Sequence, residues 1–289
     1  MRVRALDVLR LLWLTLPLTV GPAVQAGLDD ASTPVAAVAV VGLWAGWAGT
    51  LLALLVPRIT GLTVLRLAVP GLAALAVVLA VRDGVEGVDV LALGTAALVA
   101  AVALWPSVGV DLVDGSSYGP ERRLPLRVPP AVAVGAAPPA VVVVLAGVAV
   151  GPLLLAAEQW LAGALVTVVG LALAAAAVRA LHQLSRRFLV FVPGGLVVHD
   201  PMTLVEPVLF ARNGLVRVGP AEAGTGALDL TMGAGGLVME LRLQAPTDLV
   251  RRRPGRSPDQ ALHAAAVLVA PTPTAAFLAE AEARRLPVS

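Results

Sequence analysis

The feature that most constrains this chain is the apolar run Trp160–Val178, which contains no charged residue. At about 1.5 Å per residue, a helix over this run can cross a hydrocarbon core of about 30 Å. Basic residues then follow, as is typical of the cytoplasmic end of a membrane helix: Arg179, His182, Arg186 and Arg187. Next, Phe188–Val192 and Leu196–His199 flank Pro193-Gly194-Gly195, which predicts two strands and a turn. The chain therefore divides into a membrane part and a smaller soluble part.

The composition agrees with a membrane protein. Hydrophobic residues make up 58% of the chain and charged residues 14%, whereas soluble domains usually carry about 25% charged residues. All basic residues apart from histidine are scattered arginines, and the formal net charge is +2, a pattern that does not indicate nucleic-acid binding. The absence of cysteine excludes disulfides and thiolate sites, and the three histidines lack zinc-ligand spacing. We therefore expect no metal, no cofactor and no nucleic-acid partner.

Six apolar runs predict a membrane domain of six transmembrane helices over residues 1–182. The predicted spans are Leu11–Leu28, Val35–Val56, Leu67–Val81, Val90–Trp105, Ala140–Ala157 and Trp160–Val178. The third is short unless Thr63–Arg66 extends it, with Arg66 reaching toward the interface. A signal peptide is the alternative for the first run, because arginines precede it and Val24-Gln25-Ala26 resembles a cleavage site. We favour a span, since the run is long and contains Pro17 and Pro22.

The arginines predict the orientation of these spans. With both termini in the cytoplasm, the inner segments hold Arg2, Arg4, Arg10, Arg58, Arg66, Arg122, Arg123, Arg127, Arg179, Arg186 and Arg187. The outer loops then hold only Arg82, together with several acidic residues. Because cytoplasmic loops accumulate basic residues, we expect a multi-pass plasma-membrane protein with both termini inside. No ionisable residue falls near the middle of a predicted span, which argues against a proton- or ion-coupled transporter.

The second span carries glycines at helix-packing intervals. Gly42, Gly46 and Gly49, beside Trp44 and Trp47, have the spacing of a small-residue face that brings two helices together. In spans so rich in alanine and glycine, however, the same spacing also arises by chance. We favour that simpler interpretation.

One long polar loop, Ser107–Val128, interrupts the membrane half. Its candidate site residues are Asp111, Asp114, Tyr118, Glu121, Arg122 and Arg123. Two carboxylates can hold Mg²⁺ with substrate phosphates, so one hypothesis is an enzyme or lipid-handling protein that uses residues 107–128 at the cytoplasmic interface. The loop lacks the fuller pattern of the lipid-alcohol phosphotransferases. We therefore favour a connector or docking surface whose arginines follow the distribution of basic residues in inner loops.

Residues 183–289 are expected to form a small β-rich domain. Seven strands are predicted, over Phe188–Val192, Leu196–His199, Thr203–Phe210, Leu215–Val218, Leu228–Met232, Leu237–Leu243 and Ala265–Val269, with glycine, proline and aspartate in the connections. A C-terminal helix is predicted over Thr274–Leu286, with Thr272 as a cap and Pro273 in its first turn. Phe277, Leu278 and Ala281 share one face of that helix.

Seven strands followed by one helix resemble the pleckstrin-homology-like (PH-like) fold. The segments RRFLVFVPGGLVVHD (Arg186–Asp200) and VLVAPTPTAAFLAEAEARR (Val267–Arg285) are similar to bacterial PH-like domains that follow membrane hairpins. More broadly, the chain, including DGSSYGPERR (Asp114–Arg123), resembles an uncharacterised actinobacterial family of multi-pass membrane proteins. The resemblance implies a fold but no activity. Eukaryotic PH domains bind phosphoinositides through basic residues in the first strand loop, and Pro193-Gly194-Gly195 offers none.

A basic cluster precedes the last predicted strand. The candidate contacts with anionic lipid headgroups are Arg251, Arg252, Arg253 and Arg256, together with Arg186 and Arg187. Each charge near an anionic surface contributes about 1 kcal/mol, although a solvated loop is the alternative. The expected role is a non-enzymatic scaffold or accessory protein with no catalytic residues. Its expected partners are the lipid bilayer and a protein at the cytoplasmic face.

Overall fold

The computed structural model describes residues 4–82, 85, 87–252 and 259–289, and the chain divides into two units. The first, here called the helical unit, comprises Met1–Leu112 and Ala137–Leu181. The second, called the β unit, comprises Val113–Ala136 and His182–Ser289. The chain therefore passes between the units after Leu112, Ala136 and Leu181. Residues 113–136, predicted as part of the membrane domain, belong to the β unit.

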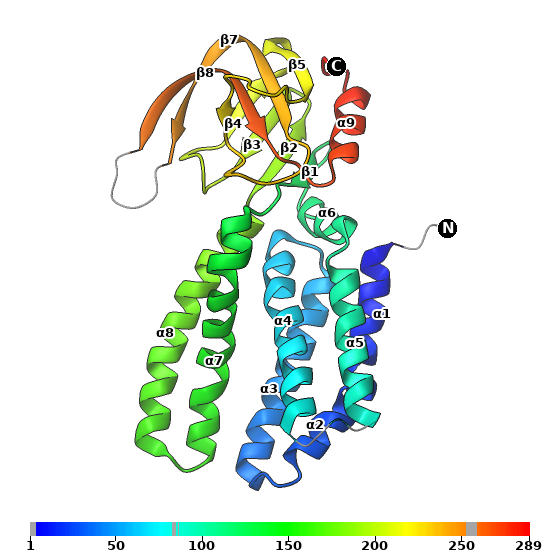
Figure 1. The fold of residues 1–289 in the computed structure, drawn as a ribbon, viewed down its shortest axis with the longest axis vertical. Helices are drawn as coiled ribbons and strands as arrows, with labels where there is room; N and C mark the ends of the chain where they lie inside the picture. The colour runs from blue at the N-terminus through cyan, green and yellow to red at the C-terminus, as the bar shows by residue number, and fades with distance from the viewer. Residues whose placement is uncertain (1–3, 83–84, 86, 253–258) are drawn as a thin grey trace. The chain divides into compact units, whose positions relative to one another are not determined.

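Long apolar helices dominate the first part of the chain (Figure 1). They are α1 (Ala5–Thr19), α2 (Gly21–Leu28), α3 (Thr33–Leu55), α4 (Ile59–Arg82), α5 (Gly87–Ala103), α6 (Pro106–Asp114), α7 (Ala137–Ala156) and α8 (Trp160–Ser185). A π-helical segment, Ala131–Ala136, leads into α7. Among the described residues, five spans have the length and hydropathy to cross a membrane: Ala5–Leu28, Thr33–Leu55, Ile59–Arg82, Ala131–Ala156 and Trp160–Ser185. The prediction of a multi-pass membrane protein is confirmed.

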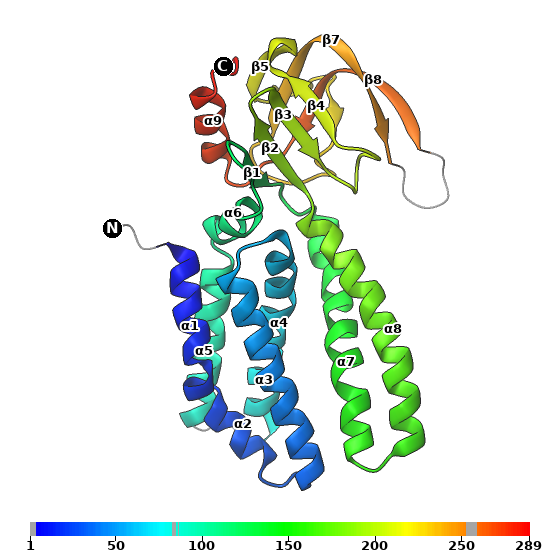
Figure 2. The same cartoon turned by 180° about the vertical axis from the view of Figure 1, so that it is seen from behind.

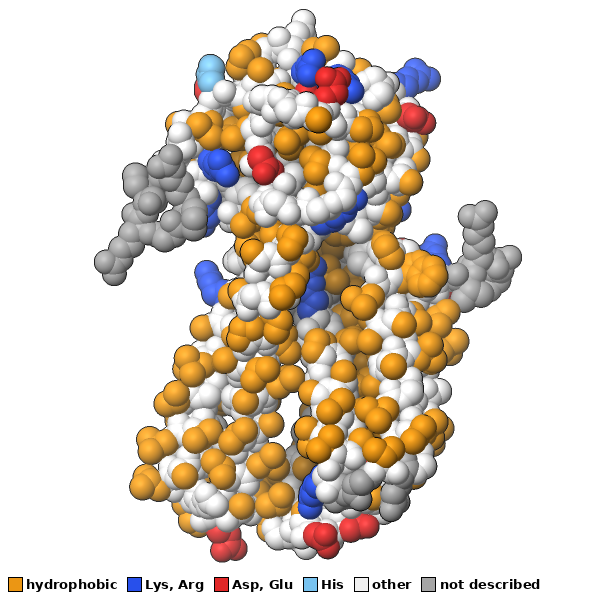
Figure 3. Space-filling model, in the orientation of Figure 1, with side chains coloured by type: hydrophobic (Ala, Val, Ile, Leu, Met, Phe, Trp, Pro, Cys, Tyr) orange, Lys and Arg blue, Asp and Glu red, His pale blue; other side chains and the backbone are white. Residues whose placement is uncertain are grey.

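The predicted number of spans, six, depends on one bent pair of helices. α5 is too short to be a span by itself and reaches the length of one only together with α6, from which it is bent by 62°. The third span is longer than predicted, because α4 begins at Ile59 and already includes Arg66. Figure 3 shows hydrophobic side chains over the visible surface of the helical unit and acidic side chains at the end where α2 meets α3 and α7 meets α8.

Two tryptophans join α1 to α3. The indole N–H of Trp47 donates to the carbonyl oxygen of Trp13 at 2.8 Å, and the indole N–H of Trp13 donates to the carbonyl oxygen of Trp47 at 3.0 Å. Pro17 lies four residues after Trp13 inside α1, and since proline has no N–H, the carbonyl of Trp13 lacks its helical donor. Because an unpaired carbonyl in lipid is costly, this bond both satisfies the backbone and fixes the helix pair.

The α7–α8 hairpin is packed through glycines. A Cβ atom on Gly147 would lie 2.4 Å from the carbonyl oxygen of Gly170, and one on Gly151 would lie 2.6 Å from the Cα of Thr167. The two backbones therefore approach as in small-residue helix packing. In contrast, a Cβ on Gly42 would meet nothing within 4 Å, and the same is true of Gly46 and Gly49. The glycines of α3 therefore make no close packing contact with the described residues, which agrees with the favoured interpretation that their spacing arises by chance.

The β unit contains two four-stranded sheets. The first has the order β1 (Arg122–Pro125), β2 (Phe188–Val192), β3 (Gly195–His199) and β4 (Val208–Ala211), all antiparallel. The second has the order β5 (Leu215–Pro220), β7 (Met239–Arg251), β8 (Gln260–Val269) and β6 (Leu228–Asp229), with β6 parallel to β8. The last helix, α9 (Thr274–Ala283), lies beside the sheets in Figures 1 and 2.

The core of the β unit is built from side chains of both sheets and of α9. Leu189 and Phe191 of β2 and Leu241 of β7 are completely buried. Phe277 of α9 is also 0% exposed, and its ring centroid lies 5.3 Å from that of Phe191. The helix therefore contributes its large aromatic side chain to the core.

Each of the seven strands predicted for residues 183–289 is present at least in part, and an eighth, β1, is added from outside that range. β1 was assigned to the polar loop, and its partner in β2 lies far along the sequence, so no local pattern revealed the pairing. The predicted strand Thr203–Phe210 forms only over Val208–Ala211. β7 and β8 also extend beyond the predicted Leu237–Leu243 and Ala265–Val269, forming a long hairpin.

Candidate functional site

Asp114 organises the polar loop that the sequence marked as a candidate catalytic site. Its carboxylate accepts hydrogen bonds from Ser117 Oγ at 2.9 Å and from the backbone N–H of Arg123 at 2.8 Å. The guanidinium of Arg122 forms an ion pair with the same carboxylate. The donors that hold Asp114 all come from its own loop, so the carboxylate closes the turn that leads into β1. A metal ion here would have to compete with these three donors for the carboxylate.

The remaining candidates in the loop are also engaged locally. Arg123 Nη2 donates to Glu121 Oε2 at 3.0 Å, and its guanidinium lies 5.5 Å from the ring centroid of Phe188. This hydrogen bond is the main cause that lowers the pKa of Glu121 below its ordinary value. Asp111 in α6 is half-buried and has a partner too, while Tyr118 is 86% exposed. Among the residues described, no three His, Asp or Glu side chains are grouped to hold a metal ion.

The same loop is built into the β unit beyond β1. Arg127 Nη1 donates to the carbonyl oxygens of Gly235 at 2.7 Å and Leu237 at 3.0 Å, and its Nη2 donates to Thr274 Oγ1 at 2.7 Å. The backbone N–H of Arg127 donates to the carbonyl oxygen of Ala270 at 2.8 Å. Arg127 thus joins the connector to the β6–β7 loop, the end of β8 and the start of α9. This arrangement favours the connector interpretation of residues 107–128 over a catalytic one.

Arg187 is not placed to meet a lipid headgroup. Its side chain is 1% exposed and forms an ion pair with Asp200, which is also buried. Its Nη1 also donates to the carbonyl oxygen of Arg127 at 3.0 Å. The neighbouring Arg186 is exposed, and its carbonyl oxygen accepts a 2.7 Å hydrogen bond from His199 Nδ1. Of the two, only Arg186 offers a guanidinium to solvent.

The other basic candidates lie at the end of β7. Arg251 is half-buried and forms a β-bridge with Leu204. Arg252 is exposed, and its backbone N–H donates to the carbonyl oxygen of Thr203 at 2.8 Å. Arg253 and Arg256 lie outside the described residues. Arg252, with Arg186, is therefore an exposed headgroup candidate in the described part of the chain.

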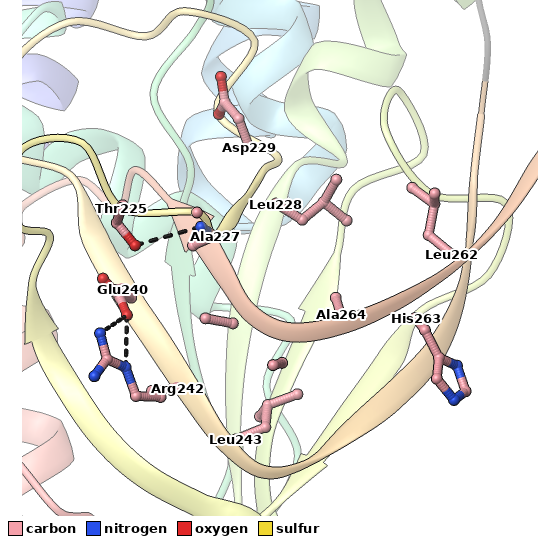
Figure 4. Close-up of a pocket in the computed structure, with 13 residues that line it drawn as sticks. Thr225, Ala227, Leu228, Asp229, Glu240, Arg242, Leu243, Leu262, His263 and Ala264 are labelled. Carbon is pink, nitrogen blue, oxygen red and sulfur yellow. Dashed lines mark hydrogen bonds and ion pairs between the residues drawn. The ribbon is translucent and has the colours of Figure 1, made fainter.

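A hollow of about 720 Å³ opens on the second sheet. Its lining comes from the turn before β6 and from β6, β7 and β8: Thr225, Gly226, Ala227, Leu228, Asp229, Glu240, Arg242, Leu243, Leu262, His263, Ala264, Ala265 and Ala266. Figure 4 shows Glu240 and Arg242 at one end, near Thr225 and Ala227, and His263 at the other. No motif pointed to this site. Glu240 and Arg242 alternate with leucines in β7, which is the pattern of a half-buried strand whose polar side chains face solvent.

A second hollow, of about 490 Å³, lies between α7 and α8. Its lining is apolar and includes Val143, Gly147, Leu165 and Leu173. Both helices are candidate membrane spans, so acyl chains are its natural neighbours and it indicates no particular ligand.

Comparisons of the chain with protein-family models, with curated proteins and with solved structures gave no match. The comparisons identify no family, and the PH-like fold stays a prediction from the sequence.

Proposed function

We propose that this multi-pass membrane protein presents its β unit at the cytoplasmic face as a non-enzymatic, PH-like interaction module. The observation that carries the proposal is the position of the segment Arg122–Arg127, which pairs with β2 through β1 and with other parts of the β unit through Arg127. The module is therefore covalently tied to membrane spans on both sides of this segment and again before β2. Such triple attachment suits a scaffold better than a freely diffusing domain.

The connectivity restricts the topology. The spans of α7 and α8 separate the two segments of the β unit, and two crossings return the chain to the same side of the membrane. The start of α1 shares that side only if α5 and α6 together form a span. The proposed orientation, with this side cytoplasmic, follows from the arginines in the inner segments and the acidic residues in the outer loops.

The assignment to a PH-like fold is supported by the two four-stranded, mostly antiparallel sheets and by the C-terminal helix that inserts Phe277 into the core. Two features depart from the expected seven-strand pattern. β1 is supplied by a segment between membrane spans, and β6 is parallel to its neighbour β8.

An exposed sheet edge supports a protein partner. β4 has β3 as its only strand neighbour among the described residues, and Leu209 in its centre is 53% exposed. The β5 edge of the second sheet is covered instead by the C-terminal residues. The backbone N–H of Val218 donates to the carbonyl oxygen of Pro287, and the carbonyl oxygen of Val218 accepts from the backbone N–H of Ser289. An open edge strand is a template for pairing with an extended segment of another protein.

The topology can be tested with cysteines, because the natural sequence has none. Ala31→Cys and Gln159→Cys, in the proposed outer loops, should react with a membrane-impermeant maleimide in intact cells. Tyr118→Cys, at an exposed position of the β unit, should react only after the membrane is permeabilised. Labelling of Tyr118→Cys in intact cells would contradict the cytoplasmic placement.

The interaction role can be tested by site-specific photo-crosslinking in native membranes. A benzophenone side chain at Leu209 should yield a discrete protein adduct, since it lies on the open edge. The same group at Glu222, an exposed position outside β4, serves as the control. An identical adduct pattern at both positions, or none at Leu209, would count against β4 as the docking edge.

A further inference from the structure

Glu240 holds a buried carboxylate in the hollow on the second sheet (Figure 4). The residue is 0% exposed, and its Oε1 accepts from Arg242 Nε and Nη2, both at 2.9 Å. Its Oε2 has no hydrogen-bond partner among the described residues. A buried carboxylate oxygen without a donor is costly. A ligand that brought a donor to Oε2 would therefore relieve a cost already present in the protein.

The charges around the hollow favour a cation. The lining residues Asp229 and Glu240 carry carboxylates and Arg242 carries a guanidinium, but Asp229 is exposed and already accepts from the backbone N–H of Thr231 at 2.6 Å, so Glu240 is the buried charge. The side chain of Arg242 is 48% exposed and that of Glu240 only 1%, so solvent screens the positive charge more than the negative one. His263 at the far end is paired with Asp248. The interior of the hollow is thus the more negative part, because charges interact more strongly where water is excluded.

Leucine and alanine side chains make up much of the remaining lining, beside Thr225 and His263. Figure 4 shows Leu228, Leu243, Leu262 and Ala264 between the Glu240 end and the His263 end. The volume of about 720 Å³ falls within the range of about 300–1,000 Å³ that small-molecule sites occupy. The hollow therefore combines one buried acceptor with a surface suited to a short hydrocarbon chain.

We propose that this hollow binds a small organic cation, namely a protonated primary amine with a short apolar chain. The ammonium group donates to Glu240 Oε2 once the side chain turns toward the hollow, because less than 1 Å² of that oxygen is accessible as it stands. The chain of the ligand lies against Leu228, Leu243 and Leu262. This site goes beyond the interaction role proposed above and does not depend on the orientation of the protein or on β4.

The test uses the full chain in phosphatidylcholine nanodiscs, with 4,4,4-trifluorobutylamine as a ¹⁹F NMR probe and empty nanodiscs as the background. The wild type should bind the amine saturably and should bind 4,4,4-trifluorobutanol, which has the same chain without the charge, much more weakly. Glu240→Gln keeps the size of the side chain but loses its charge, and should weaken amine binding by about tenfold or more. Glu282→Gln removes an exposed carboxylate on α9 and should leave binding unchanged.

A second variant guards against effects on folding. Ala265 is exposed and lines the hollow, so Ala265→Phe should block the amine sterically while Glu240 stays intact. Equal amine affinity in the wild type and Glu240→Gln, no preference for the amine over the alcohol, or unchanged binding in Ala265→Phe would each overturn the proposal. A rise in the thermal stability of Glu240→Gln with no change in amine binding would show that Oε2 is only an unsatisfied core atom.

Discussion

The side chains of Arg187 and Asp200 face each other inside the β unit as a buried, two-pronged ion pair. Arg187 Nε lies 2.9 Å from Asp200 Oδ1, and Nη2 lies 2.8 Å from Oδ2. The exposed fractions of the two side chains are 1% and 0%. Asp200 Oδ1 also accepts from the backbone N–H of Met202 at 3.0 Å. The pair thus links the start of β2 to the turn after β3.

Removing one partner of this pair should be strongly destabilising. Asp200→Leu or Arg187→Met would leave an uncompensated buried charge, which costs about 3–5 kcal/mol. The double variant should recover much of the loss, because no charge then remains buried. Thermal unfolding of the purified full chain measures the effect, with Arg186→Gln as the exposed control. An unchanged thermal stability of Asp200→Leu would mean that the pair is open to water.

Phe277 should anchor α9. Phe277→Ala removes a completely buried ring beside Phe191 and should cost about 3–5 kcal/mol. Glu282→Ala changes an exposed side chain on the same helix and should be nearly neutral. Hydrogen exchange across Thr274–Ala283 reports whether the helix has detached. Equal exchange in both variants would show that the ring does not hold the helix.

A pair of glycine substitutions should separate packed from unpacked membrane faces. Gly147→Val places a side chain against the backbone of Gly170, so α7 and α8 must separate and the protein should lose thermal stability in detergent. Gly42→Val meets nothing within 4 Å and should be tolerated. If Gly42→Val is the more harmful change, α3 uses that face in an assembly with another helix.

Asp114 should matter for structure rather than for catalysis. Asp114→Asn weakens its bonds to Ser117, Arg122 and Arg123 and should destabilise the β unit by about 1–3 kcal/mol, because β1 loses its anchoring turn. Addition of Mg²⁺ or Mn²⁺ should not stabilise the wild type. Metal binding that disappears in Asp114→Asn or in Asp111→Asn would instead favour the enzyme hypothesis.

The Glu121–Arg123 contact should add a weak acid dependence. The hydrogen bond from Arg123 lowers the pKa of Glu121 from its ordinary value of 4.5. The stabilisation of the folded protein by this contact is therefore fully present above pH 4.5. The stabilisation is lost as the pH falls through the lowered pKa, where the folded protein takes up the proton. The difference in stability between the wild type and Glu121→Gln should therefore shrink in that range. A constant difference down to strongly acidic pH would refute the assignment.

The membrane helices were predictable because a span is a local property of the sequence. The run Trp160–Val178 correctly predicted where α8 begins, yet the helix continues to Ser185. Arg179 and the residues after it end the apolar run but not the backbone hydrogen bonding. Likewise Arg66 shortened the predicted third span, although arginine is a good helix former and α4 runs through it.

Pairings between distant segments could not be predicted from the sequence. Nothing in the residues around Arg122–Pro125 indicates β2 as their partner, because a strand's neighbour is set by tertiary contacts. The burial of Arg187 and Glu240 has the same origin. Both side chains would be solvated in an isolated strand, and both are covered by segments that come from elsewhere in the chain. Candidate sites assigned from charge alone therefore included a core residue and omitted the hollow.

The position of β1 before the α7–α8 hairpin has a consequence for biosynthesis. About 60 residues separate β1 from β2, so at about 5–20 residues per second the ribosome takes about 3–12 s to supply the partner strand. During that interval β1 has no sheet to join, and the hairpin must insert first. The arginines and Pro125 of β1 suit this delay, because charged residues and proline discourage an unpaired strand from pairing with other chains. We expect the β unit to become protease-resistant only in nascent chains that extend beyond α9, after the last membrane span is in place.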